Sequence, residues 1–369
     1  MKIVKAEIRG VHLPLQSPFV ISYATFHYMP SIIVKLETDN GITGWGEAVP
    51  DEHVTGESFF GTIEILRHVL LPKVMGKNPF QIEEIHHMMN QTITANPAAK
   101  AAIDIACYDL MGKASDLPVY DLIGGRAHTE LTYPKVLSID EPEAMAEKAR
   151  EAIASGFQSL KLKVGSDYRL DVKRIQAVRE AVGGEVPIRV DANLGWHSYS
   201  TAIQAMKQLE RFHLSWIEQP IRLGDIDGLA QLKRQSTIPI MADESIQTGE
   251  QLIDMIKKEA VDKINIKLMK SGGIFPAIHI AKAAEYAGID CQIGSMVESS
   301  IGSAAGYHTA ISRKNITSTE LTGPLLFSQD IGDLHYEVPF VHLNEKPGLG
   351  LIINEETLQE LTVIHAEVH

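Results

Sequence analysis

The sequence predicts an α/β fold in which a (β/α) barrel follows a smaller α+β domain. Eight short β-rich runs alternate with amphipathic helical segments between residues 131 and 323, which is the count and spacing of such a barrel. The length of 369 residues exceeds that of most single domains. A doubly wound open sheet is the alternative, but the G-x-G-x-x-G fingerprint expected after its first strand is missing.

The first 50 residues have the pattern of a small antiparallel sheet. We expect its strands at residues 3–14, 31–38 and 44–49, with Asp39-Asn40-Gly41 as the turn between the last two. An apolar, hydroxyl-rich loop is expected at 17–30 and a second loop at 51–56. Loops of the longer kind often act as lids.

Helical spacing of apolar residues, as in Ile63, Leu66 and Leu70, begins near residue 58, and Gly124-Gly125 ends this region. We therefore expect an N-terminal domain at 1–125, the barrel at 126–324, and a tail at 325–369 that packs back on the N-terminal sheet. The expected barrel strands are 131–139, 159–164, 187–193, 214–220, 238–245, 263–269, 290–296 and 316–323.

Charge and composition exclude several classes of protein. The net charge of −13 disfavours binding to nucleic acid or to an anionic membrane, which need clustered Lys and Arg. Cys107 and Cys291 form no C-x-x-C pair, so neither a disulfide framework nor a thiolate zinc site is indicated. No secretory signal pattern and no apolar stretch of roughly 20 residues occurs. We predict a cytoplasmic protein with a small-molecule ligand.

Charged residues fall on one parity of the barrel strands. In a closed barrel alternate side chains point inward, and the active site lies at the carboxyl ends of the strands. Leu160 and Leu162 suit the outer face of their strand, which turns Lys161 and Lys163 inward. The same rule turns further polar residues inward, namely Arg189, Asp191, Asn193, Asn265 and Lys267.

Three consecutive strands end with a carboxylate: Asp191, Glu218 and Asp243. Such a ring is costly unless a cation occupies it, and hard oxygen ligands with open water positions suit Mg²⁺ better than zinc. We predict that these three residues hold one Mg²⁺. The alternative is that they are carboxylates on loop mouths, or that Lys163 and Lys267 merely pair with them as structural salt bridges.

The metal-bearing strands lie between the two strands that carry Lys163 and Lys267. A carboxylate substrate bound there would have one lysine on either face, so that one lysine removes the α-proton and the other returns it. A partly desolvated lysine near the metal is expected to have its pKa lowered toward ~7–8, which suits a base. The arrangement supports racemisation or epimerisation, and with one active lysine also β-elimination or cycloisomerisation.

These residues resemble the enolase superfamily and, within it, the muconate-lactonizing-enzyme subgroup. The resemblance spans essentially the whole chain and implies an enolase-like (β/α)7β barrel with an α+β capping domain. It also implies Lys163 and Lys267 as the acid/base pair, with Lys161 assisting near the metal, and it makes a homo-oligomer the expectation. The motifs are Lys161-Leu162-Lys163, Asp191-Ala192-Asn193, Glu218-Gln219-Pro220, Asp243-Glu244-Ser245, Lys267, Gly44-Trp45-Gly46-Glu47 and Gly294-Ser295-Met296-Val297-Glu298-Ser299.

The region after the eighth strand bears on the substrate. Dipeptide epimerases of this subgroup hold the substrate ammonium with an Asp-x-Asp pair, whereas this chain has Glu320-Leu321-Thr322. A neutral, acylated nitrogen needs hydrogen bonds rather than a counter-ion. The difference therefore favours an N-acyl amino acid, and the overall sequence resembles most the N-succinyl amino acid racemases that act on Arg and Lys derivatives. Muconate cycloisomerase ranks second and dipeptide epimerase third, while a non-catalytic binding protein would have no use for two lysines at a metal.

Side chains for substrate selection are expected in the loops. Asp51 and Glu52 are predicted to hold the cationic end of an Arg or Lys side chain by charge-assisted hydrogen bonds, the alternative being a solvated loop. Phe19 and Tyr23 are predicted to line the pocket, the alternative being ordinary core aromatics. Three further residues are assigned to substrate binding: Asn193, Met296 and Glu298.

Overall fold

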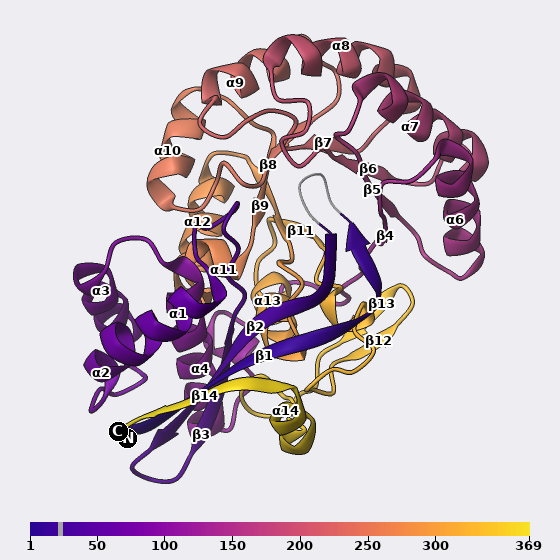
Figure 1. Cartoon of the computed structure of the whole chain (residues 1–369). Helices are drawn as coiled ribbons and strands as arrows, with labels where there is room; N and C mark the ends of the chain where they lie inside the picture. The colour runs from indigo at the N-terminus through magenta and orange to yellow at the C-terminus, as the bar shows by residue number, and fades with distance from the viewer. Residues whose placement is uncertain (21–24) are drawn as a thin grey trace.

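A computed structural model describes residues 1–20 and 25–369. It has a four-stranded antiparallel sheet with helices on one side, and a curved parallel sheet of eight strands whose helices form an outer ring (Figure 1). We call the antiparallel sheet with helices α1–α5 the cap. The eight-stranded sheet with its helices is the barrel that the sequence predicts.

The cap sheet has the strand order β14-β1-β2-β3. Its strands are β1 (Ile3–Val20), β2 (Thr25–Thr38), β3 (Thr43–Ala48) and β14 (Thr362–Val368). Its helical elements are α1 (Phe59–Ile65), η1 (Leu66–Leu70), α2 (Leu71–Val74), α3 (Ile82–Thr92), α4 (Pro97–Ser115) and α5 (Val119–Leu122). The strand β3 lies so close to α4 that a Cβ atom on Gly46 would be 1.9 Å from the carbonyl oxygen of Ala102. Glycine at this position therefore sets how closely the sheet and helix approach.

The expectation of a loop at 17–30 is wrong for the described part of that segment. β1 and β2 continue past the sheet as a two-stranded ribbon in which Phe19 pairs with Phe26 and Val20 with Thr25. Cross-strand aromatic pairs stabilise antiparallel ladders, and a pattern dominated by hydroxyls and apolar residues hid this pairing. Tyr23 lies outside the described residues.

The barrel sheet has the strand order β11-β10-β9-β8-β7-β6-β5-β4, with all neighbours parallel. Each predicted strand contains one observed strand: β4 (Lys135–Leu137), β5 (Leu160–Lys163), β6 (Ile188–Asp191), β7 (Trp216–Glu218), β8 (Ile240–Ala242), β9 (Lys263–Ile266), β10 (Asp290–Ile293) and β11 (Ile316–Thr319). Near the two edges, Thr319 Oγ1 donates to the Thr132 carbonyl oxygen at 2.7 Å. The curved sheet thus brings its first and last strands together.

Helices cover the outside of this sheet: α6 (Pro142–Ala154), α7 (Tyr168–Val182), α8 (Tyr199–Leu209), η2 (Glu210–Phe212), α9 (Ile226–Gln235), α10 (Gly249–Lys257), α11 (Leu268–Ser271), α12 (Ile274–Tyr286) and α13 (Ser300–Ile311). Leu160, Leu162 and Val190 are fully buried beneath them, as outward-facing apolar residues should be. None of the helices in the described part of the chain has the length and apolar character required to cross a bilayer.

The remaining elements are η3 (Gly323–Leu325), β12 (His335–Glu337), β13 (Phe340–His342) and α14 (Glu355–Leu361). This last part of the chain returns to the cap. Ser328 N donates to the Pro14 carbonyl oxygen at 2.8 Å, and β14 pairs antiparallel with β1. The two chain ends therefore lie beside each other (Figure 1).

Candidate active site

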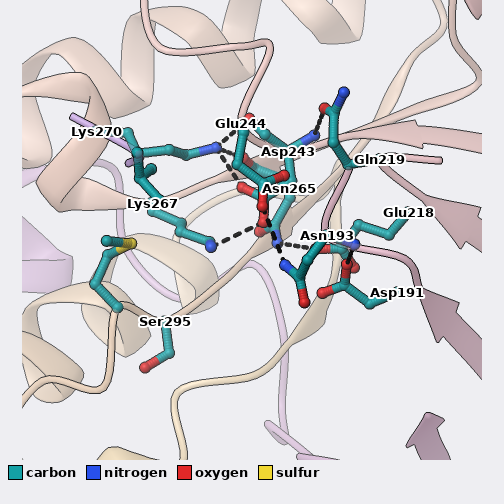
Figure 2. A network of polar contacts seen from close by, with 12 residues as sticks. Asp191, Asn193, Glu218, Gln219, Asp243, Glu244, Asn265, Lys267, Lys270 and Ser295 are labelled. Carbon is teal, nitrogen blue, oxygen red and sulfur yellow. Dashed lines mark hydrogen bonds and ion pairs between the residues drawn. The ribbon is translucent and has the colours of Figure 1, made fainter. Parts of the chain in front are cut away.

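Three carboxylates meet at the carboxyl ends of neighbouring strands. Asp191 ends β6, Glu218 ends β7, and Asp243 directly follows β8. All three side chains are fully buried, and one oxygen of each lies within 4.8 Å of the others (Figure 2). The inward parity read from the sequence thus corresponds to a real cluster.

Two oxygen atoms of the cluster have a lysine ammonium group as their neighbour and, among residues 1–20 and 25–369, no other donor in hydrogen-bond geometry. Within the described residues, Glu218 Oε2 and Asp243 Oδ2 have no partner in hydrogen-bond geometry, although lysine Nζ atoms lie 3.0 and 2.8 Å away. A carboxylate oxygen with one such ionic contact still has a lone pair that a metal ion can use. Hard, all-oxygen donors with unused lone pairs fit Mg²⁺, so the residues present suit the ion that the sequence predicts.

Lysines flank the cluster on both sides. On β5, Lys163 Nζ donates to Asp191 Oδ2 at 2.8 Å and to Asn193 Oδ1 at 3.2 Å. On the other side, Lys267 follows β9 and its Nζ lies 2.8 Å from Asp243 Oδ2. Because β6, β7 and β8 lie between β5 and β9, the two amines reach one pocket from opposite sides.

Lys161 lies among the carboxylates themselves. Its Nζ is 2.9 Å from Asp191 Oδ2, 3.0 Å from Glu218 Oε2 and 2.6 Å from Glu320 Oε2, and the residue is 1% exposed. Burial lowers the pKa of Lys161, but these negative charges outweigh burial and hold it well above its ordinary value. Lys161 is therefore a fixed cation in the floor of the site.

The carboxylates differ in pKa because their cationic neighbours differ. Burial raises the pKa of Asp191, but Lys161 and Lys163 outweigh it and hold the pKa below its usual range. The pKa of Asp243 is also held below its usual range, because the charges of Lys267 and Lys270 outweigh the effect of burial. For Glu218, burial and the charge of Asp191 prevail over Lys161 and raise the pKa to about 8.

The predicted lowering of a lysine pKa applies to a lysine beside a bound metal ion, and the protein groups alone act on Lys267 in the opposite direction. Burial lowers its pKa, but the charges of Asp243 and Glu244 outweigh burial, so the pKa is raised. The prediction from sequence rests on desolvation and a metal ion, whereas the barrel also places two carboxylates against the amine.

The pocket above the cluster lies between cap and barrel. The cap contributes Phe19 and Phe26 from the ribbon and Asp51 from the loop at 51–56. The barrel contributes Lys163, Asn193, Glu244, Lys267, Met296, Glu320 and Thr322, among others. The pocket is thus lined by both lysines and by four of the residues predicted for substrate binding: Phe19, Asp51, Asn193 and Met296.

Two predicted substrate-binding residues lie elsewhere. Glu52 is exposed, next to Asp51 but outside the pocket lining, whereas Asp51 Oδ1 accepts from the backbone N–H groups of His53 at 2.7 Å and Val54 at 2.9 Å. Glu298 is buried and accepts from Ser295 Oγ at 2.6 Å and from Met296 N at 2.8 Å. Glu298 therefore shapes the loop that presents Met296.

Two charged residues of the site, Glu244 and Lys270, were not assigned a role from the sequence. Glu244 Oε1 accepts from Asn193 Nδ2 at 3.0 Å, and burial together with the charge of Asp243 raises the pKa of Glu244 to about 7. Lys270 is 1% exposed and its Nζ donates to Asp243 Oδ1 at 2.5 Å, to the Asp243 carbonyl and to the Asn265 carbonyl at 3.0 Å (Figure 2). The signal for Lys270 was a second lysine three residues after Lys267, in a stretch that is otherwise apolar.

Comparison with known families decides the relationship. Residues 3–124 match the family described as mandelate racemase/muconate lactonizing enzyme, N-terminal domain, and residues 144–357 match the enolase C-terminal domain-like family. The chain belongs to the mandelate racemase/muconate lactonizing enzyme family. The enolase-superfamily resemblance read from the motifs is thereby confirmed, together with its fold.

Individual members of this family match over nearly their full lengths. An N-succinyl-L-Arg/Lys racemase of Bacillus cereus is 56% identical over 98% of both chains, and the crystal structure of that racemase from Bacillus cereus superposes with a TM-score of 0.99, each chain being fully covered. A hydrophobic dipeptide epimerase of Enterococcus faecalis is 41% identical over 95% of this chain and 99% of its own. The crystal structure of a dipeptide epimerase from the same organism, complexed with Mg and L-Leu-L-Tyr, has a TM-score of 0.92 over 95% of this chain and 99% of its own.

Together with these relatives, the family membership shows that the protein is an isomerase of the enolase superfamily, of the racemase and epimerase type that acts on amino acid derivatives. Muconate lactonizing enzyme from Pseudomonas fluorescens is also similar in structure, with a TM-score of 0.93 at 30% identity over 98% of this chain and 99% of its own.

Proposed function

We propose that this protein is a Mg²⁺-dependent racemase of N-acyl amino acids, and specifically of N-succinyl derivatives with Arg or Lys side chains. The observation that carries the proposal is the position of Lys163 and Lys267 on opposite sides of one pocket, next to the carboxylate cluster. The 56% identity to a racemase with that substrate supports it.

In this mechanism the two lysines exchange one proton with the substrate α-carbon. One lysine, as the amine, removes the α-proton from its face, and the opposite lysine, as the ammonium ion, returns a proton to the other face. Each turnover leaves the two protonation states exchanged, and solvent exchange restores them. The reverse reaction uses the same residues in opposite roles, as a racemase requires.

Asp191, Glu218 and Asp243 would hold the Mg²⁺. When bound, the ion supplies positive charge that stabilises the enediolate form of the substrate carboxylate. It would also offset the carboxylate charge that raises the pKa of Lys267. Lys161 adds a fixed positive charge beside two of these carboxylates, as its distances of 2.9 and 3.0 Å imply.

Substrate choice rests on the rim of the pocket. Asp51 is the carboxylate that the cap contributes to the lining, which suits the guanidinium or ammonium end of the substrate side chain. Thr322 offers a hydroxyl for the neutral acyl amide, where an α-ammonium would require a counter-ion.

The second candidate function is dipeptide epimerisation. Glu320 lines the pocket and is a possible counter-ion for a dipeptide ammonium, and the 41% identity to such an epimerase agrees with this. However, the carboxylate of Glu320 already lies 2.6 Å from Lys161 Nζ and accepts from Gln292 Nε2 at 3.1 Å. These contacts compensate its charge, so we place the N-acyl substrate first. Muconate cycloisomerisation moves from second place, as predicted from the sequence, to third, because one end of a dicarboxylate would meet the Asp51 carboxylate, whereas Glu320 in the pocket lining favours the dipeptide.

The proposal includes assembly, location and domain division. We infer a homo-oligomer acting in the cytoplasm, with a capping domain at 1–125, a catalytic barrel at 126–324 and a C-terminal segment at 325–369 that packs back on the cap. The pairing of β14 with β1 supports the last assignment.

The test is proton NMR in D₂O with Mg²⁺, on N-succinyl-L-Arg, L-Ala-L-Glu and cis,cis-muconate in parallel. Loss of the α-proton signal together with falling optical rotation is expected for N-succinyl-L-Arg. Exchange confined to the dipeptide, or lactone formation from muconate, would transfer the function to that substrate and overturn the proposal.

Variants test the proton relay separately from the substrate. Lys163→Ala and Lys267→Ala should each abolish racemisation, while one of the two enantiomers still exchanges its α-proton at the remaining lysine. Lys173→Ala, at an exposed position on α7, is the matched control. Near-normal racemisation by either active-site variant, with circular dichroism unchanged, would refute the two-lysine mechanism.

A further inference from the structure

The hairpin of β12 and β13 (Figure 1) carries a cluster of side chains of the kind that bind metal ions, and none of them lines the pocket. The cluster contains two histidines and one carboxylate: His335, Glu337 and His342. One nitrogen or oxygen atom of each lies within 4.8 Å of the others. These residues take no part in the proposed racemase reaction.

The hairpin register brings the three side chains together. His335 pairs with His342 across the ladder, and Glu337 follows His335 by two residues, which puts all three on one face. The imidazole rings stack with centroids 5.4 Å apart. Alternation along β12 also fits, because Tyr336 is half-buried between two exposed residues.

The distances suit a small tetrahedral ion. Bonds of about 2.0–2.1 Å to zinc place neighbouring tetrahedral ligands roughly 3.3 Å apart. His342 Nε2 and Glu337 Oε2 are already 3.4 Å apart. The remaining ligand atoms need to approach by little more than about 1.5 Å, which exposed side chains on a fixed backbone achieve by rotation about χ1 and χ2.

We propose that His335, Glu337 and His342 form a surface site for Zn²⁺ or a similar transition metal, with a water as the fourth ligand. Two imidazoles and one carboxylate suit zinc, whereas the all-oxygen cluster in the barrel suits Mg²⁺. The two sites therefore differ in the chemical class of ion that they select.

Binding at this site would cross-link a hairpin that supports the pocket. On the inner face Tyr336 Oη donates to the Leu321 carbonyl oxygen at 2.6 Å, between the pocket residues Glu320 and Thr322. The hairpin also joins the segment that leads into β4, because Val341 N donates to the Leu131 carbonyl oxygen at 3.1 Å. Zinc should therefore slow the opening of this hairpin.

The test is a titration of tag-free protein with Zn²⁺ in saturating Mg²⁺, followed by calorimetry and by hydrogen exchange of residues 335–342. Wild-type protein should bind one equivalent that His335→Ala and His342→Ala each weaken at least about tenfold, since even indirect partners of metal ligands have effects of that size. Exchange in the hairpin should slow with Zn²⁺ in the wild type only. His365→Ala, which removes another half-exposed histidine paired with a carboxylate, should bind like the wild type.

Equal zinc binding by the wild type and both cluster variants would overturn the proposal. An absence of zinc binding by the wild type would overturn it as well. Co²⁺ gives an independent reading. Its visible spectrum should indicate tetrahedral coordination in the wild type and lose that signal in His342→Ala. An octahedral spectrum unchanged by the substitution would also refute the site.

Discussion

Glu47 joins the cap to the barrel through a buried carboxylate. It is the next-to-last residue of the sheet strand β3, it lies beside the first turn of α13, and it is fully buried. Its Oε1 accepts from Ser31 Oγ at 2.7 Å and from Ser299 N at 2.9 Å. Its Oε2 accepts from Ser299 Oγ at 2.7 Å and from Gly302 N at 2.8 Å. Two opposing effects therefore act on this group.

Burial favours the neutral acid, and the four donors favour the carboxylate. Burial prevails, and it raises the pKa of Glu47 to about 7 from an ordinary value of 4.5. A folded-state pKa above the unfolded value means that the group's stabilising contribution is complete below pH 4.5 and is lost as the pH rises through 7. The shift corresponds to roughly 3 kcal/mol of unfolding free energy.

The perturbation is Glu47→Gln, which keeps the shape and removes the titration. We expect the unfolding free energy of the wild type, relative to this variant, to fall by roughly 3 kcal/mol between pH 4.5 and 7.5. The assay is urea unfolding followed by tryptophan fluorescence at several pH values. Glu52→Gln, at an exposed position in the same cap, is the control and should show no such trend.

A difference that does not change with pH would refute this reasoning. A wild type that gains stability relative to Glu47→Gln as the pH rises would show that the four donors overcome burial. Both results can be interpreted because Gln does not titrate, so any change of the difference with pH comes from Glu47 of the wild type.

The other predictions concern the site and the cap. Asp51→Asn should lower kcat/KM for N-succinyl-Arg by roughly tenfold to a hundredfold, because it removes a charge-assisted hydrogen bond, while Glu52→Gln should act like the wild type; equal losses in steady-state assays would contradict the assignment of Asp51. Lys270→Met should weaken Mg²⁺ binding about tenfold in calorimetry, because Lys270 orients Asp243, and unchanged affinity would exclude that positioning role. Gly46→Ala should destabilise the protein by at least about 3 kcal/mol in urea unfolding, since its Cβ would overlap the α4 backbone, and a loss below about 1 kcal/mol would mean that the sheet and helix can separate.

The barrel could be predicted from sequence because its rules are local and periodic. Side chains alternate along a strand, so an apolar parity beside a charged parity identifies the inward residues. Asp191 and Lys163 illustrate this, since they occupy paired positions on adjacent strands and form an ion pair at 2.8 Å. Chain order then places β6, β7 and β8 between the two lysine strands.

The remaining features depend on contacts between distant segments. The raised pKa of Lys267 arises from Asp243 and Glu244, and no local pattern shows how close these charges lie. Glu298 is charged and follows a strand, yet it accepts hydrogen bonds within its own loop. The ribbon of β1 and β2 does not show the alternation of polar and apolar residues that identifies a strand. Its two strands pair with each other beyond the sheet, and apolar side chains of the ribbon line the pocket.

The antiparallel pairing of β14 with β1 determines when the cap can be completed during synthesis. Ala6 pairs with Val368, which follows it by more than 350 residues in the chain. At about 5–20 residues per second, roughly 20 to 70 s pass before the ribosome supplies that partner. Throughout this time one edge of β1 has unpaired N–H and C=O groups, which is the surface that promotes association between nascent chains. The barrel strands, by contrast, neighbour one another in chain order, so the partner of each strand follows it closely in the sequence, whereas the strand made first receives its second partner last.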